Sequence, residues 1–112
     1  MGKAIVRHYI ESVNNRDDKH RSRMVIIYPN GEQEIVGYEF TFGTANYAAY
    51  KNLQLALVHL NNHGVKRFEL HTPLISFASE LTGIGDSFLA KKFRKRAALY
   101  GIELAEVRVI IE

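Results

Sequence analysis

The sequence contains no cysteine, which excludes disulfide bonds, thiolate nucleophiles and zinc–thiolate sites. This absence fits a reducing compartment, so we expect a cytoplasmic protein. The sequence also contains no run of about 18 apolar residues, which predicts that no segment spans a membrane. Its first residues lead into a charged, alternating segment, so we expect no signal peptide.

A strong excess of one charge is also missing. Lys and Arg together number 15 and Asp and Glu 12, which leaves a net charge of +3. This weakly basic balance favours nucleic acid as a partner only slightly. With 112 residues, 46% of them hydrophobic, the chain is predicted to form one ordinary globular domain over residues 1–112. No internal repeat, low-complexity tract or linker divides it.

Alternating apolar and polar residues predict three strands, over residues 4–12, 23–28 and 34–42. The polar and highly charged segment 14–21 is predicted to be a loop, and Pro29-Asn30-Gly31-Glu32 a tight turn. Strands joined by such short connections form an antiparallel meander.

The spacing of apolar residues changes after Thr44. Up to Asn62 they recur every three or four positions, which predicts a helix over 45–62 with one apolar face; they are Ala49, Leu53, Ala56, Leu57 and Leu60. Thr44 is placed to cap this helix. We further predict a strand at 65–71, helices at 73–81 and 88–100, and a last strand at 103–111. The predicted order is β-β-β-α-β-α-α-β.

Two stretches in the middle of the chain carry local sequence patterns that can be compared with known families. One reads Asn46-Tyr47-Ala48-Ala49-Tyr50-Lys51-Asn52-Leu53, and the other reads Gly64-Val65-Lys66-Arg67. Together with the order of elements they resemble ribonuclease H-like domains of the reverse-transcriptase-like branch. The resemblance implies an α/β fold with a mixed five-stranded sheet. The sequence ends at Glu112, so the final C-terminal helix of that fold is expected to be absent.

The resemblance also implies where a nuclease site would lie. Nucleases of this family hold two divalent metal ions with carboxylates, and these ions activate water and stabilise the leaving oxygen. Glu11 is the nearest match to the first-strand carboxylate, but Ala49 stands in place of the second. Pro73 replaces the third, or Thr72 if the register shifts by one residue, and the fourth belongs to the absent helix. We therefore expect no catalytic residues, no metal site and no cofactor.

The densest charge lies in the predicted helix 88–100, where five of six consecutive residues are cations: Lys91, Lys92, Arg94, Lys95 and Arg96. Such a cluster can neutralise several phosphates, which predicts salt-dependent binding of nucleic acid without sequence preference. The alternative is a solvated helix face with Phe93 turned to the core. A second basic stretch comprises Arg16, Lys19, Arg21 and Arg23. Asp17 and Asp18 lie within it and reduce its net positive charge.

Polar residues of the helix 45–62 and its cap are further candidates. Thr44 and Asn46 lie where the resemblance implies contacts to the sugar-phosphate backbone of a hybrid duplex, and the alternative for Thr44 is helix capping. His59 and His63 have a spacing compatible with a metal ion. Because a closed zinc site needs three or four ligands, we predict no metal there.

Three hypotheses remain. The first is a non-catalytic ribonuclease H-like domain that binds nucleic acid, duplex or single-stranded, through residues 91–96. The second is a pseudo-nuclease used for protein contacts, as a homodimer or with a partner, through edge strand 34–42 or 103–111. In strand 34–42 we expect Tyr38, Phe40 and Phe42 to share one face with Val36. The third, which we expect least, is an active Mg²⁺-dependent ribonuclease with a site rebuilt around Glu11.

Overall fold

The computed structural model describes residues 2–13, 18–83 and 87–110, without the side chains of residues 38–40. The predicted order of strands and helices is confirmed. The elements are β1 (Ala4–Ser12), β2 (Lys19–Ile27), β3 (Gln33–Phe42), α1 (Ala45–Asn62), β4 (Arg67–Thr72), α2 (Ile75–Thr82), α3 (Phe88–Tyr100) and β5 (Glu103–Val109). No helix in these ranges is long and apolar enough to cross a membrane.

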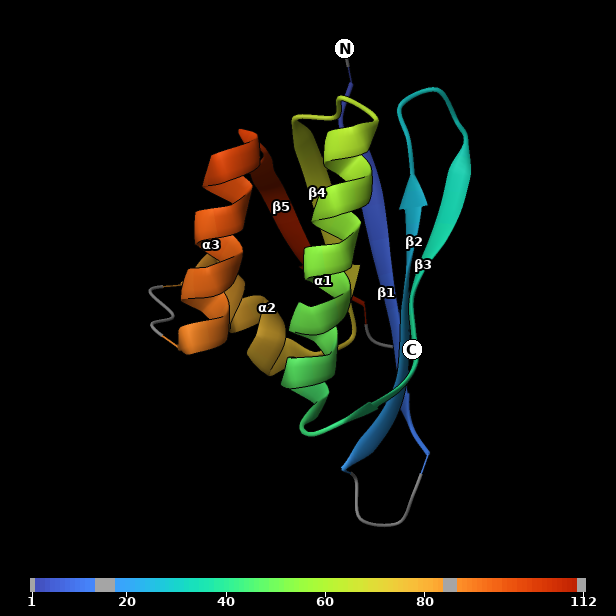
Figure 1. The fold of residues 1–112 in the computed structure, drawn as a ribbon, viewed down its shortest axis with the longest axis vertical. Helices are drawn as coiled ribbons and strands as arrows, with labels where there is room; N and C mark the ends of the chain where they lie inside the picture. The colour runs from blue at the N-terminus through green and yellow to red at the C-terminus, as the bar shows by residue number, and fades with distance from the viewer. Residues whose placement is uncertain (1, 14–17, 84–86, 111–112) are drawn as a thin grey trace.

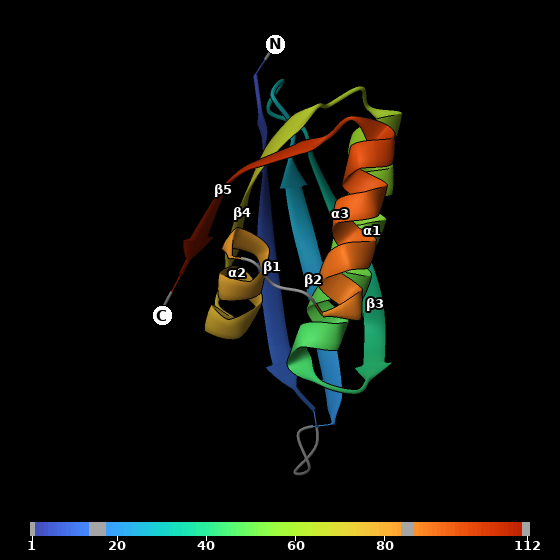
Figure 2. The same ribbon diagram turned by 90° about the vertical axis from the view of Figure 1, so that its left-hand side faces the viewer.

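The strands form one mixed sheet in the order β3-β2-β1-β4-β5. β1, β2 and β3 pair antiparallel, as the short connections predict. β4 pairs parallel to β1, and β5 pairs parallel to β4. All three helices cover the same face of this sheet (Figures 1 and 2). β3 and β5 are therefore the two edge strands, and none of the described helices covers the other face of the sheet.

The core lies between the helices and the sheet. In β1, Ala4, Val6 and His8 are buried under the helices, whereas Arg7 and Tyr9 point to the opposite face. α1 contributes the predicted apolar stripe, and Leu53, Ala56, Leu57 and Leu60 are fully buried. The alternation of β1 and the spacing in α1 thus meet in one apolar layer, and its burial is the main stabilising contribution.

Polar side chains and glycine set the helix ends. The Thr44 hydroxyl accepts a hydrogen bond from Tyr47 N at 3.0 Å, which confirms its capping role. Ser87 caps α3 in the same way, and Gly101 ends that helix with a φ of 68°. α2 begins at Ile75, two residues later than predicted, because the Thr72 hydroxyl accepts a bond from Leu74 N and holds a turn there.

Two predictions about β2 and β3 are wrong. Lys19, His20 and Arg21 belong to β2 and not to the loop; His20 is buried and polar, so the stretch lacked the apolar signal of a strand. Val36 and Phe42 do not share a face, because the pairing of β2 with β3 shifts register between His20 and Ser22. Val36 is buried, whereas Phe42 is 69% exposed. An extra residue in one strand reverses the faces beyond it.

Candidate functional site

A groove opens on the helix-free face of the sheet, where β1 ends beside the end of β4. Its volume is about 640 Å³, and Glu11 and Pro73 both line it. These are two of the positions at which the resemblance places metal-binding carboxylates. The carboxyl ends of neighbouring parallel strands are also where ligands bind in many open α/β sheets. This groove is therefore the first candidate site.

The Glu11 carboxylate is already paired. Its Oε1 atom accepts a hydrogen bond from Arg21 at 3.0 Å, and both side chains are more than half exposed. Pro73 offers no side-chain ligand. Within the described ranges, no group of three or more His, Cys, Asp or Glu residues is placed to hold a metal ion. A single carboxylate neutralised by arginine is a poor ligand for Mg²⁺, which depends on charge from several oxygens.

Ala49 and Thr72 lie in the core and not in the groove. Both are fully buried. The Thr72 hydroxyl lies 2.9 Å from His8 Nδ1, and the other ring nitrogen of His8 lies 3.0 Å from Ser22 Oγ. Asn52 of α1 donates in turn to Ser22 Oγ. A buried chain of polar contacts therefore joins α1, β2, β1 and β4 directly beneath the groove.

His8 is held neutral in this chain. Burial lowers its pKa from 6.5 to about 4, because the protein interior disfavours the charged imidazolium. The ring of Phe77 in α2 packs edge-on against it at 5.9 Å between centroids. Ser22 and Thr72 are buried hydroxyls, so neither is accessible to a substrate as a nucleophile. The chain is a structural link between the elements that form the floor of the groove.

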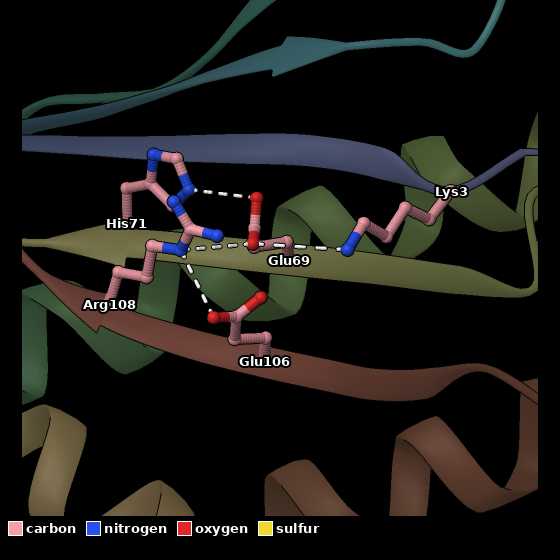
Figure 3. Close-up of polar contacts among 5 residues, drawn as sticks. All are labelled: Lys3, Glu69, His71, Glu106 and Arg108. Carbon is pink, nitrogen blue, oxygen red and sulfur yellow. Dashed lines mark hydrogen bonds and ion pairs between the residues drawn. The ribbon is translucent and has the colours of Figure 1, made fainter.

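A second polar cluster lies farther along the helix-free face and involves five residues (Figure 3). Glu69 of β4 is buried although it is acidic, with its Oε2 atom 2.9 Å from His71 Nε2. Arg108 of β5 lies 3.2 Å from Glu69 Oε1 and 3.1 Å from Glu106 Oε1. Lys3 lies 3.9 Å from Glu69 Oε1. Residues from three neighbouring segments thus surround one carboxylate.

These neighbours keep the Glu69 carboxyl ionised. Its pKa is lowered by hydrogen bonding with Glu106, by His71 and by the charges of Arg108 and Lys3, although burial opposes them. Each cation here already has an acidic partner. We therefore regard this cluster as a structural tie between β4 and β5.

The basic residues of α3 lie on the helix side of the molecule. Lys91, Lys92, Arg94 and Lys95 are exposed, and Arg96 is half-buried. Arg94 donates to the backbone carbonyls of Glu80 and Gly83, so it also fastens α3 to α2. Phe93 is buried in the core, as the solvated-face alternative also predicts. Lys91, Lys92 and Lys95 make no ion pair with a carboxylate in the described part of the chain.

A smaller groove runs between α1 and α3 and has a volume of about 330 Å³. Three cations line it, Lys51 from α1 and Lys92 and Arg96 from α3. Tyr47, 40% exposed, adds an aromatic wall at the start of α1. No carboxylate is among its described lining residues, which are completed by Tyr50, Gln54, Leu55, Val58 and Leu89. Basic and aromatic side chains are thus combined in one surface.

Thr44 and Asn46 lie near this groove in the chain but make intramolecular bonds. Thr44 caps α1, and Asn46 Oδ1 accepts a hydrogen bond from Ser76 of α2 at 3.0 Å. Neither residue lines either groove. The structure therefore places both at the junction of α1 and α2.

His59 and His63 have other partners. His59 Nδ1 lies 2.9 Å from Glu34 Oε1, which also accepts from the Tyr28 hydroxyl at 2.6 Å. The hydrogen bond from Tyr28 is the main reason why the pKa of Glu34 is lowered, with His59 adding to it. The His63 ring stacks on Tyr28 at 4.1 Å between centroids. These contacts join the end of α1 to the β2–β3 hairpin.

The grouping of arginines in the larger groove was not predicted, although Arg21 and Arg23 belong to the second basic stretch. Arg7 comes from β1 and Arg21 and Arg23 from β2, and the antiparallel register gathers them on one face. The basic stretch from Arg16 to Arg23 was the available signal, but Lys19 and Arg21 were assigned to a loop. Arg16 and Asp17 lie outside the described residues.

Comparison with known proteins finds similarity at the level of structure. No protein-family model and no curated protein matches the sequence. Ribonuclease H1 from the halophilic archaeon Halobacterium salinarum superposes with a TM-score of 0.62 at 17% identity, covering 99% of this chain and 86% of its own. A ribonuclease H1 isolated from compost by a metagenomic approach gives 0.66 at 19% identity, covering 100% and 85%.

A third neighbour is the N-terminal ribonuclease H domain of a Mycobacterium tuberculosis protein, solved as a fusion with maltose-binding protein. Its TM-score is 0.70 at 11% identity, and the alignment covers 99% of this chain and 87% of that one. At such low identities the likeness concerns the backbone and not the site. Over nearly its whole length, the chain has the ribonuclease H-like fold.

Proposed function

We propose that this chain is a non-catalytic ribonuclease H-like domain that binds nucleic acid through α3 and the groove between α3 and α1. The observation that carries the proposal is the lining of that groove, where Lys51, Lys92 and Arg96 meet Tyr47 without a carboxylate among the described residues. Grooves that combine cations with aromatic rings bind strands by neutralising phosphates and stacking on bases.

The exposed lysines extend this basic surface along α3. Lys91, Lys92 and Lys95 have no acidic neighbour to compete with a phosphate among the described residues. Lysine binds phosphate as a point charge, so the surface is suited to a backbone and not to a particular base. One neighbour, the compost ribonuclease H1, has been solved in complex with an RNA/DNA hybrid. A nucleic-acid partner for this chain agrees with that precedent.

The lack of catalysis is inferred from the charge around the larger groove. Glu11 is paired with Arg21, and Ala49 and Pro73 cannot ligate a metal ion through their side chains. Two-metal hydrolysis needs several carboxylates to hold both ions. The arginines of this groove would repel a divalent cation. We expect Mg²⁺ to produce no cleavage of RNA in a hybrid duplex.

The binding experiment compares two variants that lose the same charge. The first replaces Lys91, Lys92 and Lys95 with Gln, and the control replaces Lys3, Lys66 and Arg67, which lie outside α3, with Gln. Titrations with single-stranded, duplex and hybrid oligonucleotides are read by fluorescence anisotropy at several salt concentrations. The α3 variant should lose most of its affinity, and its salt slope should fall by about 2 to 3. Equal binding by both variants would contradict the proposal.

A second candidate function is protein binding at a sheet edge. Ile35 and Phe42 on the edge strand β3 are 68% and 69% exposed, and an unpaired edge with apolar side chains favours pairing with another strand. Val109 of the other edge strand, β5, is also exposed. Sedimentation at increasing concentration tests self-association, with Ile35→Lys as the variant that should abolish it. A monomer at every concentration would remove the homodimer form of this candidate.

A further inference from the structure

The larger groove, on the helix-free face, is lined mainly by arginine. Arg7 and Tyr9 line it from β1, and Arg21 and Arg23 line it from β2. All three arginines are exposed. Glu11 is the one carboxylate among the described residues that line it. The groove is therefore positively charged, although it lies where the fold resemblance predicts metal-binding acids.

Two of these arginines have no acidic partner among the residues that the structure describes. Arg21 forms an ion pair with Glu11, with 3.0 Å between the guanidinium nitrogen and the carboxylate oxygen. Arg7 and Arg23 make no ion pair with a carboxylate in the described ranges. In the β1–β2 ladder Tyr9 lies opposite Arg23 and Arg7 lies one pair further along the same face. The Cα atoms of such diagonal neighbours are roughly 7–8 Å apart, so the two arginines occupy adjoining positions on one face. Like charges on adjoining positions repel each other, and an anion bound between them lowers that repulsion.

Tyr9 gives the groove an aromatic wall. Its ring is 41% exposed, and the guanidinium of Arg23 lies over it at 5.5 Å from the ring centroid. This cation–π contact holds the guanidinium beside the ring before any ligand arrives. A planar guanidinium presents paired N–H donors that match two oxygens of a phosphate. The exposed ring beside it can stack on a base.

We propose that this groove binds a phosphate group between Arg7 and Arg23, carried by a nucleotide or by a nucleic-acid strand. Its volume of about 640 Å³ is sufficient for a nucleotide. Tyr9 contacts the base, and the Glu11–Arg21 pair closes the far end of the groove. The proposal goes beyond the function proposed for α3, because it concerns different residues on the opposite face of the sheet.

The test is a titration of the wild-type protein followed by backbone amide chemical shifts. The probes are inorganic phosphate, adenosine 5′-monophosphate, adenosine, and an oligothymidylate with and without a 5′-phosphate. Shifts should appear in residues 7–11 and 21–23 with the phosphorylated probes and not with adenosine. Saturation by the mononucleotide assigns a free nucleotide as ligand, and saturation only by the oligonucleotides assigns a strand.

Substitutions test whether Arg7 and Arg23 are the residues that bind the phosphate. Arg7→Gln and Arg23→Gln should each weaken binding of the saturating probe by about tenfold. The matched control is Arg67→Gln, on the same face of the sheet but paired with Glu103 at 3.3 Å, which should bind as the wild type does. The Lys91, Lys92 and Lys95 variant should keep this binding even if it loses nucleic acid at α3. Shifts confined to α1 and α3, or equal shifts with adenosine, would overturn the proposal.

Discussion

His8 and Thr72 are 64 positions apart in the chain, and their side chains meet at 2.9 Å between two parallel strands. The contact lies under the groove and continues through Ser22 to Asn52 of α1. His8 and Thr72 are 4% and 0% exposed, so little solvent is available to replace a lost hydrogen bond. The polar chain therefore couples the protonation of one imidazole to the stability of the fold.

Acid should destabilise the protein through His8. Because burial lowers its pKa to about 4, the unfolded chain binds a proton at higher pH than the folded protein does. Stability from the neutral imidazole is present above pH 6.5 and is lost as the pH falls toward 4, amounting to about 3 kcal/mol. Urea unfolding from pH 7 to 4 should be less pH-dependent in His8→Gln than in the wild type. Parallel curves would exclude His8 as the source.

Gly37 should tolerate no side chain, because the backbone of β2 lies directly against its Cβ position. A Cβ atom there would lie 2.7 Å from the carbonyl oxygen of Ser22, and the φ of Gly37 is +154°. Gly31 is the matched control, since its φ is +90° and nothing lies within 4 Å of its Cβ position. In thermal unfolding, Gly37→Ala should cost about 2 kcal/mol or more. Gly31→Ala should cost about 1 kcal/mol, from backbone strain alone. If the two substitutions cost the same, the backbones of β2 and β3 can move apart to accept the added Cβ atom.

Glu80 should contribute to stability by joining the three helices. Its Oε1 atom accepts hydrogen bonds from Tyr50 of α1, at 2.7 Å, and from Ser87 at the start of α3. Burial and the bond to Glu80 raise the pKa of Tyr50, so its hydroxyl stays a donor. Tyr50→Phe should lower the free energy of unfolding by about 1–2 kcal/mol. Tyr47→Phe, at an exposed tyrosine of the same helix, should leave the urea midpoint unchanged.

The sequence predicts an element well where its apolar residues keep a single spacing from end to end. β1 and α1 were predicted to the residue, because their apolar residues keep periods of two and of about 3.6. The start of β2 was missed because His20 and Ser22 are polar yet buried. Phe42 was assigned to the wrong face because no local sequence pattern indicates the register shift between His20 and Ser22. The arginines of the larger groove come together through the pairing of β1 with β2. The register of that pairing cannot be predicted from a single sequence.

The final prediction concerns Ala49, which lies where the resemblance to ribonuclease H-like domains implies the second carboxylate. Ala49 has no solvent exposure and packs in the apolar cluster beneath α1. A glutamate there would bury a charge without a partner, so Ala49→Glu should cost about 3 kcal/mol or more at pH 7. Ala98→Glu, on the exposed face of α3, should change stability by less than about 0.5 kcal/mol.

The pH dependence of Ala49→Glu separates a buried charge from simple overpacking. Burial should raise the pKa of the new carboxyl above its unfolded value, so the deficit in stability should shrink as the pH falls toward about 4. Overpacking alone would give a deficit independent of pH. If the variant instead keeps its stability at pH 7 and gains stability on addition of Mg²⁺, this region can still hold a metal ion. In that case the non-catalytic assignment would have to be abandoned, because Mg²⁺ stabilises the protein only if the folded chain binds it.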